Sequence, residues 1–161
     1  MSAGQCAECG AMLPESGACV TLLHELLALE ARVDGAAGGV PHVLAVATYN
    51  LQHPSTFTED ALAGLRRAVE DVLHGRATLA EVRRRAGAGA RGTARVKRRD
   101  GERPTDADRA SSAAWPTHWP TTVLDVCRLA PEQYVDHVTR WATDTIRALD
   151  AALGRVPAPT R

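Results

Sequence analysis

Residues 19–54 read CVTLLHELLALEARVDGAAGGVPHVLAVATYNLQHP, and this stretch decides the fold. Its first part repeats leucine at helical spacing, which predicts a first helix with Ser16 as its N-cap. The glycines of residues 33–40 interrupt that pattern, and a second helix is expected over residues 41–52, between two prolines. Because the connection is short, the two helices are expected to pair antiparallel.

Four residues with metal-binding side chains meet in this arrangement. Cys19 lies about 12 residues before the glycine-rich turn and His53 about as far after it, so both lie roughly 18 Å from the turn at the open end of the pair. Cys6 and Cys9, in the run Cys-Ala-Glu-Cys-Gly, form a tight knuckle that can fold over that end. Three thiolates and one imidazole are typical of a structural zinc site. The sequence therefore predicts Zn²⁺ as cofactor.

The identity of the fourth ligand stays open between three histidines. His24 follows Cys19 by about one and a half helical turns, so the two side chains point in different directions. His42 lies roughly 16 Å from His53 along the helix axis, so one ion cannot bind both. We expect His42 to lie beside Glu30 at the turn end.

Two further polar residues lie on or near the helical stripe that joins His42 to His53. They are Tyr49 and Gln52. One interpretation is hydrogen-bonded support for the metal ligands. The other is a separate polar pocket in the bundle, formed by His42, Tyr49 and Glu30.

The Cys6–Cys9 pair has a rival interpretation as a dithiol redox pair. A redox pair would be expected beside a βαβ pattern, with a helix N-terminus directly after its first cysteine, and neither is evident. Cys127 has no partner at a metal-binding spacing and is expected in the core. Metal binding is the favoured interpretation.

Composition sets the fold class. The chain has 161 residues, 45% of them hydrophobic but only 4% aromatic, so its core must consist of Leu, Val and Ala. This favours close-packed helices over a sheet. The prediction is one all-α domain over residues 1–161, a small bundle of about five helices with the knuckle packed on an antiparallel helix pair.

The remaining elements follow from capping and turn signals. Thr56 and Glu59 are expected to cap a third helix, and Thr78 and Glu81 a shorter fourth one. Trp-rich sequence resumes at Trp115 and should cover one end of the bundle. The predicted division is a zinc knuckle at 1–15, four helices at 16–86, an Arg/Gly-rich flexible loop at 87–114, and a Trp-rich segment with a C-terminal helix at 115–154.

Charge disfavours two classes of partner. Lys plus Arg equals Asp plus Glu, at 19 each, so no global field attracts nucleic acid or a membrane surface. The basic residues of 83–99 have no interleaved aromatics, which favours a solvated loop over a nucleic-acid site. No apolar run follows Met1, and a cytoplasmic protein, with a composition typical of a GC-rich bacterium, is expected.

The motifs together resemble an uncharacterised bacterial protein family, a domain of unknown function. The similar parts are Cys-Ala-Glu-Cys-Gly-Ala, the Leu-rich helix that Cys19 opens, the Tyr-Asn-Leu-Gln-His-Pro run, and the segments 122–126 and 134–141. The resemblance implies a site at Cys6, Cys9, Cys19, His42, Tyr49, Gln52 and His53. It implies no activity. Where the family often has Trp after the third Cys, this chain has Val20, so packing over the metal is expected to differ.

Two function hypotheses follow. The first is a non-catalytic module in which zinc is structural and a face of the bundle binds an unknown protein or small-molecule partner. The second is an enzyme, either metal-dependent or using the polar pocket around His42 and Tyr49. Catalytic zinc commonly has more His or carboxylate ligands and a bound water, so a site with three thiolates is poorly suited to hydrolysis. This favours the module.

Overall fold

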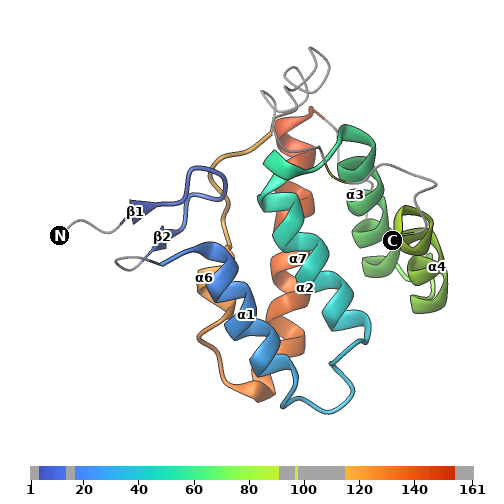
Figure 1. Ribbon diagram of the computed structural model, residues 1–161, viewed down its shortest axis with the longest axis horizontal. Helices are drawn as coiled ribbons and strands as arrows, with labels where there is room; N and C mark the ends of the chain where they lie inside the picture. The colour runs from blue at the N-terminus through green and yellow to red at the C-terminus, as the bar shows by residue number, and fades with distance from the viewer. Residues whose placement is uncertain (1–3, 14–16, 91–96, 98–114, 155–161) are drawn as a thin grey trace.

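The computed structural model describes residues 4–13, 17–90, 97 and 115–154. This part of the chain is predominantly helical, which confirms the predicted helical bundle, and it adds one small β-hairpin (Figure 1). The α-helices are α1 (Cys19–Glu30), α2 (Val40–Gln52), α3 (Glu59–Leu73), α4 (Leu79–Ala90), α6 (Val123–Val126) and α7 (Tyr134–Ala152). Two 3₁₀ turns, η1 (Pro54–Thr56) and η2 (Pro131–Gln133), and two strands, β1 (Gly4–Gln5) and β2 (Met12–Leu13), complete the list.

Helix α2 lies at the centre of the bundle. It runs antiparallel to α1 and packs against α1, α3 and α7, while α6 packs against α1 (Figure 1). The start of α1 and the end of α2 therefore lie at one end of the pair, beside the hairpin. No helix in the described ranges combines the length and the apolar character that crossing a bilayer requires.

The connection between α1 and α2 depends on glycine. Gly35 and Gly38 adopt positive φ of 73° and 67°, a region that L side chains rarely occupy. A Cβ at Gly39 would come within 2.6 Å of the carbonyl oxygen of Gly35. Gly39 is the N-cap of α2, and Pro41 lies in the first turn, where its missing N–H costs no hydrogen bond.

The cap of α3 differs from the expected one. Thr56 belongs to the 3₁₀ turn η1, and Thr58 is the N-cap, accepting a hydrogen bond from the Ala61 N–H. The sequence prediction was wrong here because η1 places Thr56 before the point where α3 can begin. The box of Thr78 and Glu81 is present at α4.

Two predicted boundaries also shift. Helix α4 continues to Ala90 rather than ending at 86, and most of the predicted flexible loop, 91–96 and 98–114, lies outside the described residues. Ser16 lies outside them too. The N-cap of α1 is Ala18, whose side chain makes no capping bond.

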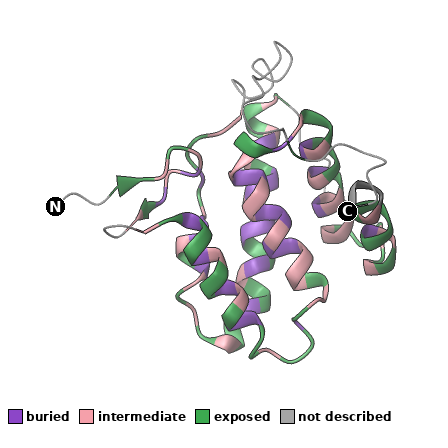
Figure 2. Cartoon of the chain, in the orientation of Figure 1, coloured by how far each residue is buried: buried purple, intermediate pink, exposed green. Residues whose placement is uncertain are grey.

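The core runs along α2 and α7 (Figure 2). Its largest fully buried apolar side chains are Leu26, Leu51, Val69, Val123, Val126, Tyr134, Val138, Trp141 and Leu149. Each such side chain contributes about 1.5–3 kcal/mol when it leaves water. Cys9 and Cys19 belong to the same cluster, so the core reaches the hairpin end of the bundle, and Cys127 packs against it from the side.

Candidate metal centre

The knuckle is the turn that joins β1 to β2. The Cys6 N–H donates to the Ala11 carbonyl and the Gly10 N–H donates to the Cys6 carbonyl, each at 2.9 Å. Gly10 has φ +77°, and a Cβ there would lie 3.0 Å from the Thr117 carbonyl oxygen. Glycine after the second cysteine thus lets the chain reverse and lets the tryptophan segment pack against the turn.

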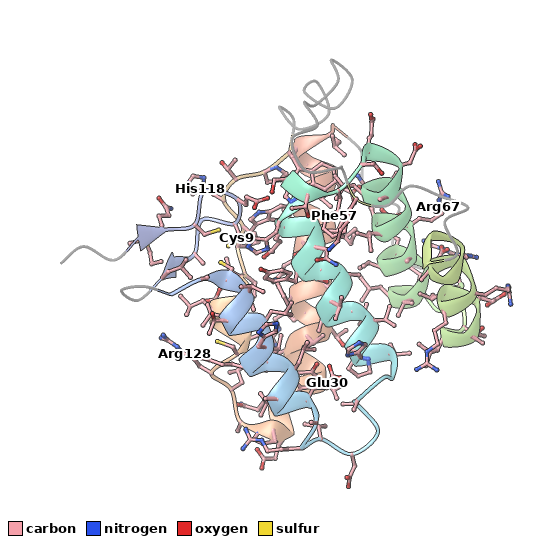
Figure 3. All side chains as sticks on the ribbon, viewed as in Figure 1. Cys9, Glu30, Phe57, Arg67, His118 and Arg128 are labelled. Carbon is pink, nitrogen blue, oxygen red and sulfur yellow. The ribbon has the colours of Figure 1, made fainter. Side chains whose placement is uncertain are left out.

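Two helix ends bring the other members of the site. Cys19 is the first residue of α1, and His53 is the C-cap of α2, with φ −128° and ψ 65°. Because the helices are antiparallel, these two residues lie at the same end of the pair. The turn of the knuckle covers that end, where Cys9 lies in Figure 3.

The four side chains form one cluster. The sulfurs of Cys6, Cys9 and Cys19 and a ring nitrogen of His53 all lie within 4.8 Å of one another. Cys9 Sγ is 3.5 Å from Cys19 Sγ, and Cys6 Sγ is 3.7 Å from His53 Nε2. The edges of a tetrahedral zinc site are about 3.8 Å between two sulfurs and about 3.5 Å between sulfur and nitrogen, given Zn–S near 2.3 Å and Zn–N near 2.0 Å. All four cysteines of the chain are free thiols, so the cluster could hold one metal ion.

Tyr49 orients the imidazole of His53. The Nδ1–H of His53 donates to the Tyr49 carbonyl at 2.8 Å, and the Tyr49 ring stacks on the imidazole with centroids 4.1 Å apart. Because a carbonyl only accepts, the proton is on Nδ1 and the lone pair of Nε2 faces Cys6. A histidine ligand held through its other nitrogen is the usual arrangement at a metal.

Burial sets the protonation of the thiols. It raises the pKa of Cys9 to about 11, and it raises the pKa of Cys19 with further help from the Cys9 thiol. Burial opposes ionisation of Cys6 too, but the backbone N–H groups of Cys9 and Glu8 lower its pKa on balance. Burial lowers the pKa of His53, which keeps the imidazole neutral and able to ligate. A cation would offset the cost of placing three thiolates together.

The other predicted site residues lie elsewhere. His24 is exposed on α1 and does not belong to the cluster. Gln52 is fully buried, and its amide nitrogen donates to the Thr121 carbonyl at 2.8 Å and to Thr145 Oγ1 at 2.9 Å. Gln52 therefore ties α2 to α7 and to the segment before α6.

His42 lies at the opposite end of the helix pair, beside Glu30. Its Nδ1 is 2.8 Å from Glu30 Oε1, and the Tyr134 hydroxyl donates to Glu30 Oε2 at 2.5 Å. Glu30 is only 3% exposed and is labelled in Figure 3 far from Cys9. Tyr49 stacks on His53 at the end where the thiols lie, so the predicted grouping of His42, Tyr49 and Glu30 is divided between the two ends.

Sequence reasoning missed several contacts of the cluster. The carboxylate of Glu8 accepts hydrogen bonds from the Ser55 N–H at 2.9 Å and from Ser55 Oγ at 3.1 Å. Trp119 Nε1 donates to the Glu8 carbonyl at 3.4 Å, and Trp115 Nε1 donates to the Leu51 carbonyl at 2.7 Å. The only signal for Glu8 was its place between two cysteines.

Comparison with known proteins gives one match. The model of a family of unknown function, DUF5946, matches residues 4–150 of the 161-residue chain, which include all four clustered residues. No curated protein and no solved structure matches significantly. By this match, and in keeping with the resemblance of its motifs, the chain belongs to the DUF5946 family.

Proposed function

We propose that the protein is a helical module stabilised by one Zn²⁺ ion, which Cys6, Cys9, Cys19 and His53 bind. The observation that carries this proposal is the convergence of their four ligand atoms within 4.8 Å of one another. The residues come from three separate parts of the chain: the hairpin, the start of α1 and the end of α2.

The donor set favours zinc. Thiolate is a soft ligand and imidazole a borderline one, and a tetrahedral set of three sulfurs and one nitrogen is typical of structural zinc. Magnesium and calcium prefer oxygen ligands, which this cluster does not supply.

The ion would join the hairpin to the bundle. Strands of two residues each, Gly4–Gln5 and Met12–Leu13, are too short to be stable alone. Bonds from one ion to Cys6 and Cys9 on one side and to Cys19 and His53 on the other would fix the hairpin in place. In such sites the free energy of metal binding is free energy of folding.

The closed ligand set supports a structural role for the metal. A catalytic zinc commonly has three protein ligands and a position for water, whereas four residues of this chain converge here. We therefore assign the metal to stability, in a single domain over residues 1–161, and assign function to the binding of a protein or small-molecule partner by the bundle.

One observation favours the enzyme as a second candidate. Buried Glu30 accepts from His42 Nδ1, and a carboxylate in that position can orient an imidazole as a general base. His42 would be its central residue, with Tyr134 in the place that we expected for Tyr49. Activity that His42→Ala abolishes in zinc-loaded, folded protein would support this candidate over the module.

Elemental analysis by plasma mass spectrometry tests the proposed function. We expect about one zinc per chain in protein purified without chelator, and its loss or sharp weakening in Cys19→Ala and His53→Ala. Cys127→Ala is the matched control, because Cys127 lies outside the cluster, and it should keep its zinc. Absence of stoichiometric metal from the wild-type protein would refute the site and direct attention to Cys6 and Cys9 as a redox pair.

A further inference from the structure

Glu8 lies between the two knuckle cysteines and contacts the segment that follows His53. Both of its carboxylate oxygens accept hydrogen bonds from Ser55, Oε2 from the backbone N–H at 2.9 Å and Oε1 from Oγ at 3.1 Å. Hydrogen bonds to an ionised acceptor are roughly twice as strong as those between neutral groups. One side chain of the knuckle is thus held at two points by a residue two positions after His53.

The backbone of Glu8 is held as well. Its carbonyl accepts from Trp119 Nε1 at 3.4 Å, and Trp119 is buried. Glu8 is therefore the residue at which the knuckle, the tryptophan segment and the 3₁₀ turn η1 meet.

His53 lies between α2 and the 3₁₀ turn η1. Its N–H donates to the Asn50 carbonyl at 3.2 Å and its ring contacts Tyr49, so these contacts hold it to α2 but not to the knuckle. The hydrogen bonds between Glu8 and Ser55 join the knuckle directly to the segment that follows His53. The contact between Glu8 and Ser55 therefore bears on the distance between the knuckle and the imidazole.

We propose that Glu8 is a positioning residue of the metal centre, which anchors Ser55 and so holds His53 at ligating distance from the Cys6–Cys9 pair. This inference rests on the proposed zinc site. Glu8 does not ligate the ion. It sets the distance between the Cys6–Cys9 pair and His53 before the ion binds. Removing a residue that orients a metal ligand without binding the metal itself typically weakens metal affinity by about 10–100-fold.

The test is the zinc affinity of the full chain, measured by competition with a chromophoric chelator. Glu8→Ala should bind Zn²⁺ about 10–100-fold more weakly than the wild type. Glu8→Gln keeps one oxygen that accepts from Ser55 and should recover part of that loss. Glu132→Ala is the control, because Glu132 is an exposed glutamate of η2, and it should bind as the wild type does.

A double-mutant cycle separates positioning from a general structural effect. If Glu8 acts through His53, then Glu8→Ala should cost little, within about 3-fold, once His53→Ala has removed the imidazole. The Co²⁺-loaded Glu8→Ala protein should keep its thiolate charge-transfer band and change its d–d bands, because the nitrogen ligand is the one displaced.

Wild-type affinity in Glu8→Ala would overturn the inference, and so would an equal loss in the His53→Ala background. If Glu8→Ala does not fold, Glu8→Gln and Ser55→Ala carry the same comparison, since each removes part of the same contact. A wild-type chain that binds no Zn²⁺ refutes the proposed function, and the role of Glu8 with it. A wild-type chain that binds Zn²⁺ with no dependence on Glu8 refutes this inference alone.

Discussion

At one end of the α1–α2 pair, three thiols and an imidazole meet, whereas at the other end a carboxylate, an imidazole and a phenol meet. Cys19 and Glu30 are the first and last residues of α1, so they belong to different ends of the pair (α1 in Figure 1). Both ends place side chains from separate elements against one another. They differ in whether the chain itself supplies every group that the cluster requires.

The turn end, where the α1–α2 connection lies, needs no group from outside the chain. Glu30 is nearly fully buried, and its two oxygens receive one donor each, from His42 and from Tyr134. A buried carboxylate is tolerated when it is hydrogen-bonded in this way. At the thiol end, burial raises the pKa of Cys9 and of Cys19, so ionising the cysteines together is unfavourable unless a cation is bound. One end therefore needs only the fold, and the other, on the proposed function, is completed by an ion.

The largest expected effect is removal of zinc by a strong chelator. We expect residues 4–13 and the first turn of α1 to lose their structure, because the ion would be what joins the hairpin to the helices. Structural zinc contributes about 10–16 kcal/mol in zinc-finger peptides, so a loss of several kcal/mol is expected here. Amide hydrogen exchange is the measurement, and the hairpin and the start of α1 should gain exchange first.

The same experiment tests whether the two ends of the helix pair are independent. Exchange around Glu30 and the first turn of α7 should rise much less than in the hairpin. Equal loss of protection at both ends would show that the ion holds the whole bundle, and that the turn end is not independent.

The next effect is that of Tyr134→Phe. It removes the hydroxyl that donates to Glu30 and leaves a buried carboxylate with one donor fewer. Hydrogen bonds to charged groups contribute about 1.5–3 kcal/mol, and we expect a loss of this size in the free energy of unfolding, with zinc content unchanged. Urea unfolding of the zinc-loaded protein measures it.

A double mutant provides the control for Tyr134→Phe. Glu30→Gln removes the charge, so adding Tyr134→Phe to it should cost less than the sum of the two single losses. Strict additivity would mean that the hydroxyl stabilises something other than the carboxylate.

Local spacing explains why part of this arrangement is predictable from sequence. The meeting of Cys19 and His53 depends on two helices of nearly equal length and one turn, which rise per residue and glycine positions determine. The placement of His42 beside Glu30 follows from the same reasoning, and the structure shows that contact. The helical class follows from a core poor in aromatics.

Contacts between distant segments explain what sequence did not show. Tyr134 is 104 residues from Glu30, and the packing of both α1 and α7 against α2 brings them together. Gln52 was grouped with the His42–His53 stripe, but α2 is surrounded by other helices and the Gln52 amide contacts Thr145 of α7. The Glu8–Ser55 contact likewise depends on where the hairpin lies on the bundle. Periodicity shows which residues share a face of a helix, but not which neighbour that face meets.

His42→Ala should have a smaller effect than Tyr134→Phe. It also removes a partner of Glu30, but the His42 side chain is 40% exposed, so solvent screens the interaction and water can replace the lost donor. We expect a loss of about 0.5–1.5 kcal/mol, with one zinc per chain retained. Chemical unfolding of the zinc-loaded protein measures it. A loss larger than that of Tyr134→Phe would show that the imidazole is the main partner of the carboxylate.

The smallest expected effect is that of Thr78→Ala, because Thr78 belongs to neither of the two side-chain clusters. Thr78 caps α4, where its hydroxyl oxygen accepts from the Glu81 N–H. Among the described side chains, α4 contributes none to the thiol cluster, and its Arg83 contacts the Gly38 carbonyl rather than Glu30. Thr78→Ala should cost about 0.5–1 kcal/mol, the usual range for losing a threonine cap. Because α4 and the hairpin lie on opposite sides of the bundle (Figure 1), the loss should be the same with bound zinc and after chelation, provided that the bundle stays folded. Thermal unfolding in both conditions measures it. A larger loss in the chelated protein would mean that α4 and the metal end are coupled through the bundle, and that the two ends are less independent than their separate side-chain clusters indicate.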